Sequence, residues 1–122
     1  MDAKPDTVTP LGAAHYESEL FISGLQLRVT TLRPNYYMQN ILAFADSIVH
    51  ADSFCIPTGN SRIGMINAED VGQMAANLAL RTPRNNNSYL LSGPYSLSFH
   101  EVARKISLVI GREINCLEVS FE

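Results

Sequence analysis

The spacing of apolar and polar positions divides the first third of the chain into a helix and a strand. Residues 11–23 have helical composition, and a Thr-Pro pair before them is a favourable helix start. Gly24 is placed to end this helix in the left-handed conformation. Residues 25–32, LQLRVTTL, alternate aliphatic or β-branched with polar side chains, which predicts a strand. We expect Pro34 to end that strand.

A second helix is predicted directly after the proline. From Tyr36 to about His50 the apolar positions recur at helical spacing, and the apolar face is wide enough to predict a largely buried helix. Residues 58–61, TGNS, have turn composition and separate an extended segment at 53–57 from a short strand at 62–66.

The remaining pattern predicts two amphipathic helices and two strands. Asn67 is expected to cap a helix whose apolar stripe consists of Val71, Met74, Ala75 and Leu78. A loop at 83–87 and a strand at 89–92 follow. Ser98 and Glu101 have the spacing of a capping box, which predicts a helix that starts after Ser98. Gly111 is expected to end this helix. Its predicted buried stripe consists of Phe99, Val102, Ala103, Ile106, Val109 and Ile110. An extended segment is predicted at 113–119.

This order of elements indicates the fold class. Strands that alternate with amphipathic helices of this length are typical of an α/β architecture with mostly parallel pairing. The 122 residues suffice for one small domain with a modest core. Residues 1–9 are polar and are expected to form a loose N-terminal lead.

Composition excludes several functional classes. A net charge of −3 with scattered Lys and Arg residues argues against a nucleic-acid partner. No apolar run reaches the ~18–20 residues that span a bilayer, and the N-terminus does not resemble a signal peptide. A cytoplasmic location without membrane contact is therefore expected. Cys55 and Cys116 are each expected to be small buried apolar residues.

Known catalytic motifs are mostly missing from the pattern. No GxGxxG is present, and residues 59–64, GNSRIG, lack the lysine that a phosphate-binding loop requires. His15 and Glu19 lie four residues apart and could share a metal, but a metal needs a third ligand that the sequence does not offer. We interpret them as an exposed helical pair. Tyr16 has Leu20 four residues on, so it lacks the lysine of a YxxxK pair.

The corner after Pro34 is the best candidate binding site. In open α/β sheets, ligands bind beyond the carboxyl ends of strands. Pro34 fixes the backbone, Asn35 offers both a donor and an acceptor, and Tyr36 and Tyr37 offer flat faces with polar tips. The corner suits a planar, partly polar ring. The alternative, weighted equally, is that the two tyrosines only pack the start of the helix.

Three blocks of sequence resemble one family. HYESELFISGLQLRVTTLRPNYYMQNIL, GNSRIGMINAEDVGQMAANLAL and SYLLSGPYSLSFHEVARKISLVIGREINCLEV follow the order and approximate spacing of the C-terminal half of the NmrA-like family. These proteins are atypical short-chain dehydrogenase/reductases, and they include NAD(P)H-dependent quinone oxidoreductases and NADP-sensing regulators. The resemblance extends from about His15 to the end of the chain.

The resemblance implies a fold and a set of site residues. It implies a partial Rossmann-like, NAD(P)-binding α/β fold over residues 10–122, with the substrate-side subdomain but without the N-terminal βαβ half that binds the dinucleotide. NADP or NAD is the implied cofactor, with Pro34, Asn35 and Tyr36 as cofactor-binding residues. Tyr37 and Asn40 are the implied substrate-binding residues. No catalytic residue and no metal are implied.

Three functions are compatible with this resemblance. The first is that the chain is the substrate-side portion of an NAD(P)H-dependent oxidoreductase that reduces a quinone, an enone or an imine. It could instead be a non-catalytic NADP sensor, or a truncated fragment that is inactive alone. We expect the isolated chain to be inactive and to self-associate through exposed apolar helix faces.

Overall fold

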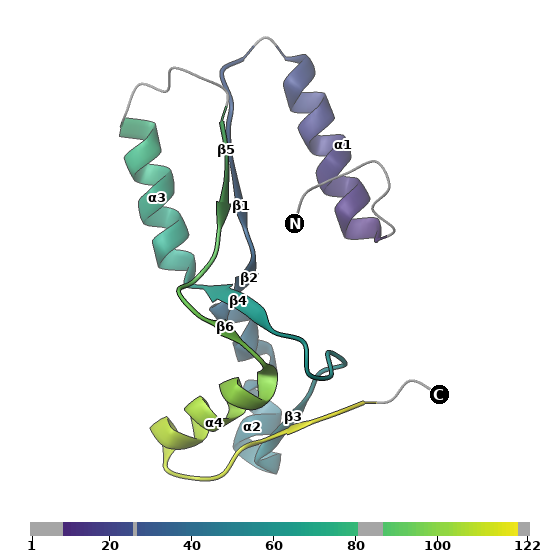
Figure 1. The fold of residues 1–122 in the computed structure, drawn as a ribbon, viewed down its shortest axis with the longest axis vertical. Helices are drawn as coiled ribbons and strands as arrows, with labels where there is room; N and C mark the ends of the chain where they lie inside the picture. The colour runs from purple at the N-terminus through teal and green to yellow at the C-terminus, as the bar shows by residue number, and fades with distance from the viewer. Residues whose placement is uncertain (1–8, 26, 81–86, 120–122) are drawn as a thin grey trace. The chain divides into compact units, whose positions relative to one another are not determined.

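The computed structural model describes residues 9–25, 27–80 and 87–119. Its elements, shown in Figure 1, are α1 (Pro10–Gly24), β1 (Thr30–Pro34), β2 (Tyr36–Tyr37), the 3-10 helix η1 (Met38–Phe44), α2 (Ala45–Ala51), β3 (Ser53–Cys55), β4 (Ile63–Ile66), α3 (Ala68–Leu80), β5 (Asn87–Leu91), β6 (Ser96–Leu97), α4 (Phe99–Ile110) and β7 (Asn115–Leu117). Helices and strands alternate, and the pairs β1–β5, β2–β4 and β3–β7 are parallel. The predicted α/β class is confirmed. The expected loose lead and most of the loop at 83–87 lie outside the described residues.

The chain forms two compact units. The first unit combines Met1–Asn35 with Glu69–Leu91, and the second combines Tyr36–Ala68 with Ser92–Glu122. Each unit is therefore built from two separate stretches of sequence. The boundary at residues 35 and 36 falls inside the corner that the sequence analysis selected.

The first unit is a two-stranded parallel sheet with two helices. Strands β1 and β5 pair in register from Thr30 opposite Asn87 to Pro34 opposite Leu91, and Figure 1 shows α1 and α3 on either side of this pair. The Thr9 hydroxyl accepts a hydrogen bond from the Gly12 amide at 3.2 Å and caps α1 as predicted. The helix does end at Gly24, but the next residue is extended, so the predicted left-handed termination there is wrong.

Strand β1 corrects the predicted strand at 25–32. It begins at Thr30 and includes Pro34, so the proline lies within the strand. The Asn35 amide donates to the Leu91 carbonyl at 2.9 Å. Since successive residues of a strand point their backbone groups to opposite sides, position 34 directs its backbone away from β5. Proline has no amide to donate there, so it fits without weakening the β1–β5 ladder.

The second unit contains the hydrophobic core. Strands β2, β4 and β6 form a three-stranded sheet, and β3 pairs with β7. The core cluster consists of Ile48, Phe54, Met65, Phe99, Val102, Ala103 and Ile114. Phe54 and Phe99 are 1% and 0% exposed, and their ring centroids are 6.5 Å apart in an edge-on arrangement. Strand β6, which positions Ser98 and Phe99 at the start of α4, was not predicted.

The predicted helix at 36–50 has a different structure. Its first two residues form β2, residues 38–44 form η1, and α2 begins only at Ala45. Ile48 is the buried residue of α2, whereas Leu42 is 71% and Val49 is 55% exposed. The second unit therefore covers part of the predicted apolar face, because Ile41 and Phe44 pack with Ile48 against the core.

Helix α4 follows its prediction closely at both ends. Ser98 and Glu101 form both hydrogen bonds of a capping box, and Gly111 ends the helix with φ at 73°. The predicted buried stripe holds for the first two turns, but Val109 is 86% exposed.

The cysteines differ from expectation as well. Cys55 is exposed and Cys116 is half-buried. They lie on the paired strands β3 and β7, where Phe54, and not Cys55, occupies the buried position opposite Cys116. Within residues 9–25, 27–80 and 87–119, no helix has the length and apolar character needed to cross a bilayer.

Candidate functional site

Pro34 and Asn35 lie at the carboxyl end of β1, where the first unit ends. The Asn35 backbone is held by its hydrogen bond to Leu91, the last residue of the parallel neighbour β5. Its side chain is exposed. The carboxyl ends of two parallel strands therefore lie side by side here, which is the edge of an α/β sheet at which ligands bind.

Tyr36 and Tyr37 open the second unit as strand β2. They pair in parallel with Met65 and Ile66 of β4, and both side chains are half-buried. The Tyr36 ring packs edge-on against Phe99, with centroids 5.6 Å apart and planes at 86°. Burial raises the pKa of the Tyr36 phenol, so this group stays protonated near neutral pH and can donate a hydrogen bond.

The η1 segment contains the predicted residue Asn40 and a second polar residue, Gln39, that the sequence analysis missed. Asn40 is exposed, as a ligand-binding side chain can be. Its neighbour Gln39 instead makes two tertiary hydrogen bonds, donating to Asn67 at 2.6 Å and accepting from the Ala68 amide at 3.1 Å. Gln39 thus satisfies the amide of the first residue of α3. The separation of 28 and 29 residues explains why no local sequence signal revealed it.

Gly93 is a second residue that the motif search passed over. A Cβ atom at this position would lie 1.8 Å from the Met65 carbonyl oxygen, so no other residue fits without a backbone shift. The glycine allows the chain to pass directly over β4 at the residue that pairs with Tyr36. Close backbone approach is a common reason for glycine in such a position.

Backbone amides at the N-termini of α1, α3 and α4 are bound by groups of the chain itself. Backbone amides there usually bind anions. The α1 amides are capped by Thr9, the Ala68 amide of α3 is bound by Gln39, and α4 carries the Ser98–Glu101 capping box. Glu69 and Asp70 add negative charge to the first turn of α3. The amides bound in this way are therefore not free to bind a phosphate.

An open cavity of about 350 Å³ lies between α4 and β7 in the second unit. Its lining includes His100, Arg104, Glu113 and Cys116. Burial, followed by the nearby Cys55 and Glu118, raises the pKa of the Cys116 thiol. A thiol that stays protonated is a poor nucleophile, so this arrangement does not favour cysteine catalysis.

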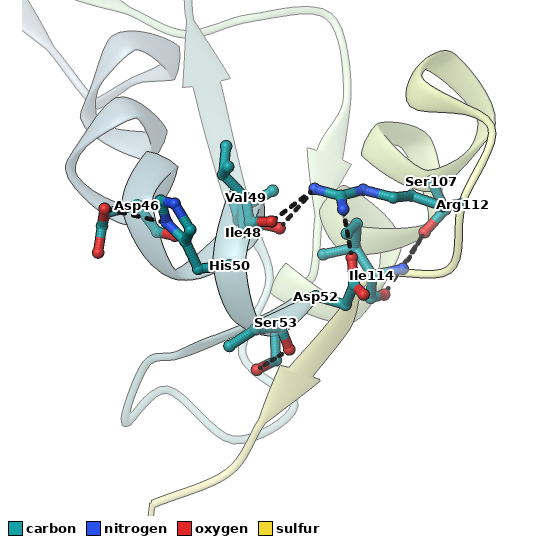
Figure 2. A network of polar contacts seen from close by, with 10 residues as sticks. Asp46, Ile48, Val49, His50, Asp52, Ser53, Ser107, Arg112 and Ile114 are labelled. Carbon is teal, nitrogen blue, oxygen red and sulfur yellow. Dashed lines mark hydrogen bonds and ion pairs between the residues drawn. The ribbon is translucent and has the colours of Figure 1, made fainter.

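Arg112 forms the main polar network of the second unit, shown in Figure 2. Its guanidinium donates to the carbonyls of Ile48 and Val49 at 3.0 and 3.1 Å and pairs with Asp52 at 3.1 Å. These carbonyls belong to the last turn of α2, so the arginine closes that helix end. The Ser107 hydroxyl similarly accepts from the Ile114 amide at 2.8 Å. This network is structural.

The predicted His15–Glu19 pair is replaced by a longer-range contact. Glu19 accepts two hydrogen bonds from Arg33 of β1, at 3.0 Å to Nε and 2.5 Å to Nη2, while His15 is exposed. A bidentate guanidinium–carboxylate pair is the stronger arrangement. No group of three metal-ligating side chains occurs among the described residues.

Comparisons with known proteins relate the chain to part of longer oxidoreductases. No family model matches the sequence. The chain is 28% identical over 120 residues to the NAD(P)H azoreductase of Xenophilus azovorans. The aligned region covers 98% of this chain and 42% of the azoreductase. It is 29% identical over 93 residues to the uncharacterized oxidoreductase YesF of Bacillus subtilis, covering 75% of this chain and 32% of that protein.

Solved structures show the same partial match. An NADPH-dependent quinone oxidoreductase of Escherichia coli in complex with NADPH superposes with a TM-score of 0.84 at 21% identity, over 94% of this chain and 41% of the other. The triphenylmethane reductase of Citrobacter sp. in complex with NADP(H) gives 0.78 at 19% identity, over 94% and 41%.

Together these matches define the class of protein. The chain has an α/β fold that corresponds to a portion of Rossmann-like, NAD(P)-binding structures. Its sequence is related, over that portion, to NAD(P)H-dependent oxidoreductases. It spans about two fifths of the length of the azoreductase.

Proposed function

We propose that the chain is the substrate-side portion of an NAD(P)H-dependent oxidoreductase of the NmrA-like type that reduces a quinone-like, enone or imine acceptor. The observation that carries this proposal is the alignment with the NAD(P)H azoreductase over 98% of the chain. The reduced nicotinamide would supply the hydride, and the residues of this chain would orient the ring and the acceptor.

The corner at residues 34–37 supports this assignment chemically. Pro34 and Asn35 lie at the end of a parallel strand. The exposed side-chain amide of Asn35 can donate a hydrogen bond to a carboxamide of the ligand and accept one from it. In the proposal, these two residues and Tyr36 contact the cofactor, and Tyr37 and Asn40 contact the acceptor. Tyr36 is held against the core by Phe99, so its role would be to position the backbone and present a neutral phenol.

The test uses the 122-residue chain together with the part of the azoreductase that it does not span, expressed in the same cells. NADPH oxidation by the purified material is followed by absorbance, with a quinone and an azo dye as acceptors. We expect turnover only when both parts are present, and a lower kcat/KM for Asn40→Ala with unchanged circular dichroism. The variant Asn60→Ser, which changes an exposed residue outside the corner, serves as the surface control.

Two results would argue against the proposal. Saturable NADPH binding without turnover on any acceptor would favour a dinucleotide sensor. Micromolar NADPH affinity of the isolated chain would show that the phosphate site lies within these 122 residues, contrary to the proposal that this chain is the substrate-side portion.

A further inference from the structure

The η1 segment is an unusually long 3-10 helix. It extends over the 7 residues Met38–Phe44 and continues directly into the α-helix α2 at Ala45. Runs of more than about three or four residues are uncommon, because the hydrogen bonds of a 3-10 helix have poorer geometry than those of an α-helix. Neither η1 nor α2 has a side-chain hydrogen bond at its N-cap. Contacts with other residues of the second unit must therefore hold η1 in this conformation.

The three faces of η1 have different surroundings. A 3-10 helix has about three residues per turn, so residues three positions apart lie on the same face. Ile41 and Phe44 share the face that packs against the core. Gln39 shares the second face with the exposed Leu42, and Asn40 lies on the third face with its side chain exposed. The 3-10 conformation therefore directs Asn40 away from the core and away from the face that carries Gln39.

The side-chain amide of Gln39 links η1 to residues 67 and 68 of the same unit. Its Nε2 donates to Oδ1 of Asn67 at 2.6 Å, and its Oε1 accepts from the Ala68 amide at 3.1 Å. Because one planar amide uses its nitrogen and its oxygen at the same time, the two bonds fix its orientation as well as its position. Asn40, the other polar residue of η1, makes no side-chain hydrogen bond to the part of the chain that the structure describes.

We propose that Gln39 is a positioning residue, which holds η1 as a 3-10 helix and thereby directs Asn40 toward the acceptor. Without its two hydrogen bonds, η1 should relax toward the α-helical conformation of α2, with which it is continuous. The two helix types have about 3.0 and 3.6 residues per turn, so between Asn40 and Phe44 they differ by about 80° of rotation. The contact of Asn40 with the acceptor rests on the proposed function, whereas the conformation of η1 does not.

The conformation of η1 is tested by nuclear magnetic resonance on the isolated chain. In Gln39→Ala, the Ala68 amide should exchange with solvent at least about tenfold faster, because its acceptor is lost. Contacts between residues four positions apart, which are typical of an α-helix, should appear within residues 38–44. Gln39→Glu keeps an acceptor oxygen and should keep the slow exchange of Ala68. The exposed Gln73 of α3 provides the matched control, Gln73→Ala, which should change neither readout.

The positioning role is tested by kinetics on the chain co-expressed with the part of the azoreductase that it does not span. Gln39→Ala should raise the KM for the acceptor by about three- to tenfold, with little change in kcat or in the KM for NADPH. In an Asn40→Ala background the same substitution should not change the acceptor KM further, because the residue that Gln39 positions is gone. A merely structural role would lower kcat in both backgrounds through loss of folded protein and would leave the acceptor KM unchanged.

Either of two results would overturn the positioning role of Gln39. The first is an unchanged η1 conformation and unchanged Ala68 exchange in Gln39→Ala. The second is an effect of Gln39→Ala on the acceptor KM that is as large in the Asn40→Ala background as in the wild-type chain. Absence of turnover by the wild-type assembly would reject the proposed function and with it the contact between Asn40 and the acceptor. The exchange rate of the Ala68 amide would still decide whether Gln39 holds η1.

Discussion

The two units of the chain both contain large apolar residues but bury them very differently. In the second unit Phe99 is fully buried at the start of α4, and the core gathers side chains from helices and strands that are distant in sequence. In the first unit Phe21 is 71% exposed on α1. A hydrophobic residue stabilises a fold only where a second layer covers it, at roughly 25 cal/mol per Å² of area removed from water. Such layers meet around Phe99 in the second unit, whereas Phe21 and the other large apolar residues of α1 stay exposed in the first unit.

The largest expected effect comes from a matched pair of phenylalanines. Phe99→Ala should lower the free energy of unfolding by about 3–5 kcal/mol, because it leaves a cavity beside Phe54 and Tyr36. Phe21→Ala should change it by about 0.5 kcal/mol or less. Urea denaturation followed by circular dichroism measures both. Equal losses would mean that α1 is covered as well as α4.

Two glycines sharpen the comparison in opposite directions. Gly93→Ala should destabilise the second unit by about 1–3 kcal/mol, since the new Cβ would meet the Met65 carbonyl. Gly72 lies within α3 and has open space around it, so Gly72→Ala should stabilise that helix by about 0.5–1 kcal/mol. Thermal unfolding compares the two variants. Tolerance of alanine at position 93 would show that the chain does not pass tightly over β4.

Arg112 should have a smaller effect, confined to the second unit. Arg112→Ala removes the hydrogen bonds to Ile48 and Val49, and we expect a loss of about 1–2 kcal/mol because the side chain remains 44% exposed. The exposed Arg104 on α4 is the control, with an expected change of about 0.5 kcal/mol or less for Arg104→Ala. The urea midpoint measures both, and equal effects would argue against closure of α2 by Arg112.

The smallest effect is a pH dependence. The Ser98 backbone amide, and then Arg62, lower the pKa of Glu101 against the opposing effect of its burial. A carboxylate with a lowered pKa in the folded state contributes stability above its unfolded pKa and loses it as the pH falls through the folded value. The urea midpoint of the wild-type chain should therefore fall in mild acid. Glu101→Gln should reduce that slope, and an unchanged slope would show that another group is responsible.

Local sequence was a reliable guide where the interactions are local. The cap at Thr9, the capping box at Ser98 and Glu101, and the left-handed Gly111 each depend on residues within four positions of one another. The period of the apolar positions also predicted α3 and α4. The site residues were selected by the same kind of reasoning, and their roles stay predictions.

Boundaries that depend on distant partners were predicted less well. Strand β1 starts at Thr30 because β5 is available to pair there, and not where the alternation of LQLRVTTL begins. The residues after Tyr37 form a 3-10 helix where Gln39 bonds to Asn67 and Ala68, which lie nearly thirty positions away. The Arg33–Glu19 pair replaced a predicted local pair for the same reason.

The sequence by itself determined the class of fold, the start of α1 and both ends of α4, and it selected the candidate corner, because periodicity and capping act over a few residues. Only the tertiary structure decided which apolar faces become a core. Burial requires a second surface at the same place, and no local pattern specifies whether that surface is present. It is present around Phe99 and missing, within the described residues, along α1.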